Sequence, residues 1–87
     1  MVSYKPELDR LDEIVADLDQ TIGTPQGLMR EHLMVARAYI LDGMADELKL
    51  QLDLVREAIP QLDAGEVRRR IECLLGNLQS ASESGPR

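Results

Sequence analysis

Apolar residues recur at spacings of three and four along most of the chain, and this spacing places them on one face of an α-helix. In the first such stretch the apolar positions are Leu8, Leu11, Val15, Leu18 and Ile22. Pro6 suits the first turn of a helix, and Gly23 suits the position just after the last turn. The pattern therefore predicts a first helix that still contains Ile22 and stops at Gly23.

A second helix is predicted between Thr24-Pro25 and Asp42-Gly43. Thr24 suits the N-cap and Pro25 the first helical position, while Gly43 suits a turn. Apolar residues occupy most of the circumference of this helix: Leu28, Met29, Leu33, Met34, Val35, Ala36, Ala38, Tyr39, Ile40 and Leu41. We therefore expect it to be the central and most buried helix.

The third segment, from Met44 to Pro60, allows two interpretations. Residues 48–54 alternate strictly between leucine and polar residues, which is typical of a half-buried strand. However, Leu, Lys, Gln and Asp form strands poorly, and the sequence offers no second strand for pairing. We therefore predict a helix that ends at Pro60, because proline cannot continue it without losing a hydrogen bond.

As a helix, the third segment has two apolar faces. Leu48, Leu52, Val55 and Ile59 form one stripe, and Leu50 and Leu54 lie almost opposite it. Four short helices can hardly bury both faces, and an exposed apolar face marks an interaction surface. Leu50, Leu54 and Ala58 are therefore the candidate partner-binding residues.

The fourth helix is predicted to begin at Asp63-Ala64-Gly65-Glu66, which fits a capping box. Its apolar stripe is Val67, Ile71, Leu74, Leu75 and Leu78. Residues 80–87 are small and polar, and we expect them to be disordered. The sequence thus predicts one all-α domain over residues 1–79, a four-helix bundle-like fold with a central antiparallel hairpin.

The hairpin segment, Met29–Leu62, resembles a single tetratricopeptide repeat. Val35, Ala36, Tyr39, Gly43, Leu52 and Pro60 fall at that family's spacings. The segment departs from the family at His32, where a large aromatic residue is usual, and at Leu48 and Val55, where alanine is usual. The pattern does not repeat after Leu62. The resemblance implies a helical hairpin that binds peptides or proteins and performs no catalysis.

Composition and charge restrict the classes of partner. The chain has 87 residues with a formal net charge of −6, which disfavours binding to nucleic acid or to an anionic membrane surface. No apolar run approaches the ~20 residues of a membrane span, and the first residues lack the apolar region of a signal peptide. We therefore expect a cytoplasmic protein.

Few residues suggest chemistry. His32 and Cys73 are the only histidine and the only cysteine, so the chain offers neither an internal disulfide nor a clustered metal site. The carboxylates of the first helix spread along a surface face, and no glycine-rich phosphate loop occurs. We expect no enzymatic activity, no cofactor, no metal and no small-molecule substrate.

Arg68, Arg69 and Arg70 form the single basic cluster. Three successive residues fan over about 200° of a helix, so they cannot make one flat patch. They either form a solvated face or contact an acidic partner, for which the acidic first helix of a second copy is a candidate.

Two functions remain open. The first is a non-enzymatic protein–protein interaction module, adaptor or chaperone-like, that buries the Leu50/Leu54 face against a partner protein or a second copy, with a homodimer expected. The alternative is a small acidic regulatory subunit of the antitoxin or anti-factor type, whose first helix would cover a basic surface on one target.

Overall fold

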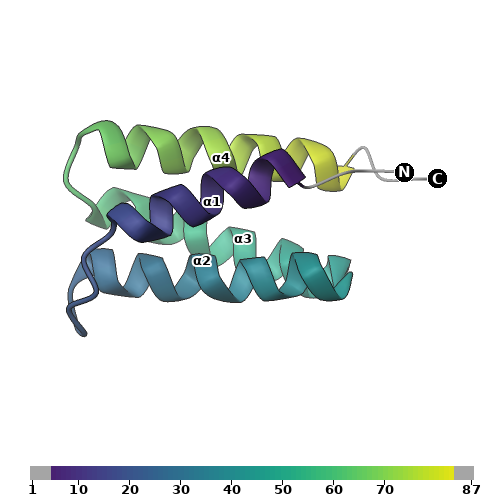
Figure 1. Cartoon of the computed structure of the whole chain (residues 1–87), viewed down its shortest axis with the longest axis horizontal. Helices are drawn as coiled ribbons and strands as arrows, with labels where there is room; N and C mark the ends of the chain where they lie inside the picture. Colours follow the sequence, from purple (N-terminus) through teal and green to yellow (C-terminus); the bar gives the residue numbers. More distant parts are fainter. Residues whose placement is uncertain (1–4, 84–87) are drawn as a thin grey trace.

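The computed structural model describes residues 5–83 (Figure 1). Within them the chain forms α1 (Lys5–Asp17), α2 (Pro25–Asp42), α3 (Ala45–Ala58), the short 3-10 turn η1 (Ile59–Gln61) and α4 (Glu66–Glu83), and residues 5–83 contain no strand. The all-α prediction is confirmed. The alternating segment 48–54 lies inside α3, so its helical interpretation is also confirmed.

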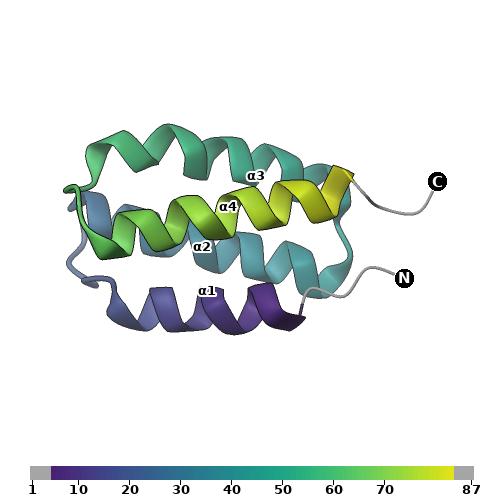
Figure 2. The ribbon, with the colours of Figure 1, turned by 90° about the horizontal axis from the view of Figure 1, so that it is seen from above.

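The helices form two layers and alternate in direction. α2 and α3 lie antiparallel in one layer, and α1 and α4 pack on each other in the second (Figures 1 and 2). α1 also packs on α2, and α4 on α3, which gives an elongated bundle of 39 × 21 × 20 Å. Each helix therefore has two neighbours and turns its opposite side to solvent.

One apolar stripe from each helix fills the centre of the bundle. The most deeply buried large side chains are Leu11, Ile14, Met29, Leu33, Leu52, Val55, Ile71, Leu74 and Leu78. The packing is mainly aliphatic, with Tyr39 half-buried against it, and follows the three-and-four spacing read from the sequence.

α2 is less buried than its sequence predicted. Its buried apolar side chains are Met29, Leu33 and Ala36, whereas Leu28, Met34, Val35 and Leu41 are exposed by 40–58%. The prediction that this helix is the most buried one was wrong, because α2 has helices on only two sides. Tyr39 and Ile40 are half-buried against the core, while the four exposed residues stay at the surface.

The predicted hairpin boundaries of α2 and α3 are confirmed. The Gly27 backbone N–H donates to the Thr24 side-chain oxygen at 3.1 Å, so Thr24 caps α2. Gly43 ends the helix with a left-handed φ of 70°, a conformation that glycine adopts without strain. Pro60 lies in η1, which begins directly after Ala58, the last residue of α3.

The first helix is shorter than predicted, since α1 ends at Asp17 and leaves Ile22 in the following loop with 91% exposure. Asp19 provides the physical reason. Its carboxylate accepts hydrogen bonds from the Thr21 backbone N–H (2.8 Å) and hydroxyl (2.6 Å), which hold the chain in a turn. The same two bonds keep the pKa of the Asp19 carboxyl below its ordinary value.

Both predicted ends of the fourth helix differ from the structure. α4 begins at Glu66, so Gly65 rather than Asp63 precedes its first turn, and the capping box was placed wrongly. α4 also continues to Glu83, so residues 80–83 of the segment expected to be disordered are helical. Residues 84–87 lie outside the described part of the chain, as do residues 1–4.

Ion pairs within the chain connect α4 to α1, and α2 of one layer to α1 of the other. Arg70 Nη1 donates to Asp17 Oδ2 at 2.6 Å, and Arg70 Nη2 lies 3.9 Å from Glu13 Oε2. This contact raises the pKa of Arg70 above its ordinary value, chiefly through the hydrogen bond to Asp17. Arg37 Nε similarly donates to Asp12 Oδ1 at 2.9 Å. Carboxylates of the acidic first helix thus form ion pairs with arginines of the same chain.

Alanine substitutions at two neighbouring positions of α2, one buried and one exposed, should differ in their cost to stability. We expect Leu33→Ala to lower the free energy of unfolding by about 2–5 kcal/mol, because the removed side chain is buried and leaves a cavity. Met34→Ala, at a position that is 46% exposed, should cost less than about 1 kcal/mol. Urea denaturation followed by circular dichroism measures both. Equal losses would contradict this placement of the core.

Replacing either of two helical glycines with alanine should change the stability of the fold in opposite directions. A Cβ at Gly27 would lie 2.2 Å from the Thr21 carbonyl oxygen, so Gly27→Ala must displace the α1–α2 loop and should destabilise the fold by about 1–3 kcal/mol. A Cβ at Gly76 meets nothing within 4 Å, so Gly76→Ala should stabilise α4 by about 0.5–1 kcal/mol. Thermal unfolding of both variants checks the sign, and stabilisation by Gly27→Ala would rule out the close loop packing.

Candidate functional site

Two leucines predicted as partner-binding residues are exposed on α3. Leu50 exposes 67% of its surface and Leu54 exposes 45%. The opposite face of the same helix contributes Leu48, Leu52 and Val55 to the core. α3 therefore has an apolar face that the fold itself leaves uncovered.

Ala58, the third predicted residue, is only 8% exposed and belongs to the core cluster. Around the helix it lies between Val55 and Leu54, at the edge of the buried stripe. Ala58 therefore adds little surface to a contact, and the exposed part of this face is carried by Leu50 and Leu54.

A buried glutamine sets the register between α2 and α3. Gln51 is 6% exposed, and its Nε2 donates to the His32 carbonyl oxygen at 2.9 Å and lies 3.3 Å from His32 Nδ1. Because the two helices are antiparallel, Leu54, one turn after Gln51, lies toward the same end of the pair as Leu28, one turn before His32.

The same register brings four exposed apolar residues onto one surface. Leu28 and Val35 of α2 flank His32 at spacings of four and three, and they are 41% and 40% exposed. From the helical spacing and this register we infer that they form, together with Leu50 and Leu54, an apolar strip on the outer side of the α2–α3 pair. We call this set (Leu28, Val35, Leu50 and Leu54) the outer strip.

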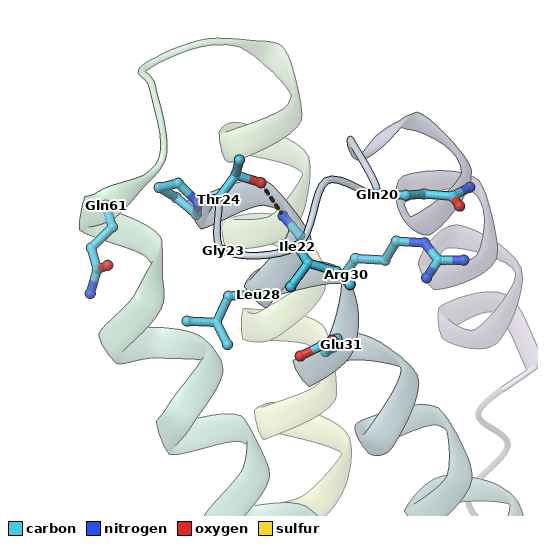
Figure 3. A pocket seen from close by; sticks show the side chains of 10 residues that line it. Gln20, Ile22, Gly23, Thr24, Leu28, Arg30, Glu31 and Gln61 are labelled. Carbon is cyan, nitrogen blue, oxygen red and sulfur yellow. Dashed lines mark hydrogen bonds between the residues drawn. The ribbon is translucent and has the colours of Figure 1, made fainter.

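The outer strip meets a shallow depression at the start of α2. Ile22, Leu28, Arg30, Glu31 and Gln61 are among the residues that line its volume of about 210 Å³ (Figure 3). This volume is below the roughly 300–1,000 Å³ of a typical small-molecule site. The depression shares Leu28 with the outer strip and reaches the α1–α2 loop, and polar as well as apolar residues line it.

Sequence reasoning missed Leu28, Val35 and Ile22 as surface residues. Ile22 was assigned to the stripe of the first helix, and the other two were assigned to the core of α2. The Asp19–Thr21 turn, which removes Ile22 from the helix, had a local signal in the residues Asp19, Gln20 and Thr21. The exposure of Leu28 and Val35 had no local signal, because it depends on where α1 and α4 pack.

The described residues contain no group of three His, Cys, Asp or Glu side chains placed to hold a metal ion. His32 and Cys73 lie on different helices; the imidazole is next to Gln51, and the thiol is exposed on α4.

Within residues 5–83, no helix has the length and apolarity that crossing a membrane requires.

Comparison of the chain with protein-family models, with curated proteins and with solved structures gives no match. The resemblance of Met29–Leu62 to a tetratricopeptide repeat therefore stays a prediction that rests on its residue pattern.

Proposed function

We propose that this chain is a non-enzymatic protein–protein interaction module of the adaptor or chaperone-like kind, which buries its outer strip against a partner protein or a second copy. One observation carries this proposal: Leu50 and Leu54 are 67% and 45% exposed on a helix whose other face is fully used by the core. An apolar surface that continues over two helices, rimmed by polar residues, is characteristic of interaction sites.

The size of the outer strip limits the binding free energy that its burial can supply. Full burial of one large aliphatic side chain is worth about 1.5–3 kcal/mol. Since the four residues are already roughly half buried, completing their burial contributes about 3–6 kcal/mol in all. A dissociation constant of 1 μM corresponds to about 8 kcal/mol, so polar or charged contacts around the strip have to add to it.

The alternative, an acidic regulatory subunit that covers a basic target with its first helix, is less well supported. Asp12 and Asp17 of α1 accept hydrogen bonds from Arg37 and Arg70 of the same chain. A basic target would have to compete with these internal ion pairs. If α1 nevertheless served as the binding face, substitutions in the outer strip would leave complex formation unchanged.

Two charges placed on the outer strip should abolish association without unfolding the chain. We expect Leu50→Glu with Leu54→Glu to keep the helical circular-dichroism spectrum, because both positions are already exposed. Self-association is measured by light scattering over a dilution series. Contact with another protein is measured by photo-crosslinking in cells from a benzoylphenylalanine placed at Val35. Both signals should fall to background in the double variant.

The matched control is Met34→Glu with Leu41→Glu, which places the same charges at positions of α2 that are 46% and 58% exposed. Both lie away from the side of α2 that carries His32 and contacts Gln51 of α3, so association should persist. Loss of folding in the Leu50/Leu54 variant would mean that this face is core. If the unsubstituted chain neither self-associates nor yields an adduct, the proposed function is wrong.

A further inference from the structure

Carboxylates surround the outer strip on α3. Asp46 and Glu47 lie one turn before Leu50, and Glu57 lies one turn after Leu54. Residues three or four positions apart are neighbours on a helix surface, so these side chains border the two leucines. All three carboxylates are exposed.

α2 completes this border. Glu31 lies three residues after Leu28 and four before Val35, so it neighbours both apolar residues of the strip along one side of α2. Asp42 lies two turns beyond Val35 on the same side. Both are exposed. We call Glu31, Asp42, Asp46, Glu47 and Glu57 the acidic rim.

The basic residues of α2 and α3 are placed outside the outer strip. Arg37 bonds to Asp12 of α1, and Arg56 lies 3.7 Å from Asp53 one turn away. Lys49 is about 100° around the helix from Leu50, and Arg30 turns toward the α1–α2 loop in Figure 3. The outer strip is therefore an apolar surface bordered by negative charge.

We propose that the outer strip receives a basic amphipathic helix of another protein. Its aliphatic side chains would pack on Leu50, Leu54 and their neighbours of α2, while lysines and arginines on its flanks would pair with the acidic rim. An amphipathic helix that buries its apolar face against another protein is a recurring mode of peptide recognition. The 14 residues of α3 extend over about 21 Å, which matches about four turns of the bound helix.

The acidic rim also argues against a second copy as the occupant. Two outer strips facing each other would bring ten rim carboxylates together, five from each chain, and every chain carries a net charge of −6. Juxtaposed like charges across an interface are unfavourable and suppress that pairing. A basic partner removes this repulsion and supplies the charged contacts that the apolar strip needs.

Because the helix docks on the outer strip, this inference rests on the proposed function, and the test separates the two. The probe is a fluorescein-labelled synthetic 18-residue peptide with leucines on one helical face and lysines elsewhere. One control peptide replaces every lysine with glutamate, and another has the same composition with the leucines scrambled. Fluorescence anisotropy measures binding to the full chain at low and at moderate salt.

The protein variants test the rim and the strip separately. Neutralising the rim with Glu31→Gln, Glu47→Gln and Glu57→Gln should weaken binding of the basic peptide at least tenfold. The control, Asp9→Asn with Glu13→Gln and Glu72→Gln, removes the same charge from α1 and α4 and should weaken binding less than about threefold. Leu50→Glu with Leu54→Glu should weaken it at least as much as the rim variant, although it adds negative charge.

The expected result is preferential binding of the amphipathic basic peptide, weakened by salt and by the rim variant. Equal binding of the scrambled peptide, or equal effects of both neutralised variants, would mean unspecific charge attraction and overturn the inference. Binding of neither peptide also overturns it. Preference for the glutamate peptide, or a stable dimer that Leu50→Glu with Leu54→Glu dissociates, would overturn the basic partner while the proposed function stands.

Discussion

The structure depends on one geometrical constraint: in a two-layer bundle of four short helices, each helix can bury only one stripe. Each helix packs on two neighbours and faces solvent on its other side. α1 and α4 match this constraint, because their apolar residues form single stripes that pack together. α2 and α3 carry more apolar surface than one stripe. Part of the excess forms the outer strip, and the rest, Met34 and Leu41, is exposed on another side of α2.

Features that depend on neighbouring residues could be predicted from the sequence. Thr24, Gly43 and Pro60 act through caps, a left-handed turn and a missing backbone N–H, which are local properties, and all three were placed correctly. The end of α1 was missed although its cause is also local. The Asp19 carboxylate bonds the Thr21 backbone N–H, and this turn competed successfully with an apolar spacing that continued to Ile22.

The candidate site was only half predictable, for a tertiary reason. Leu50 and Leu54 were identified because they lie opposite a clear core stripe on the same helix. Leu28 and Val35 gave no such contrast, since α2 is apolar nearly all round and its buried face is chosen by the helices that pack on it. Arg70 is similar: its contact with Asp17 joins residues 53 positions apart, and no local pattern predicts it.

The internal ion pairs determine where the net charge of the protein acts. Asp12, Glu13 and Asp17 of α1 lie against Arg37 or Arg70 of the same chain, so the most acidic helix in the sequence is partly neutralised in the fold. The acidic rim of α2 and α3 borders the outer strip instead, while Arg56 pairs with Asp53 beside it. Apolar exposure and negative charge therefore coincide on one side of the bundle. Hydrophobic burial there would supply affinity, and the rim would select the charge of the partner and speed its approach.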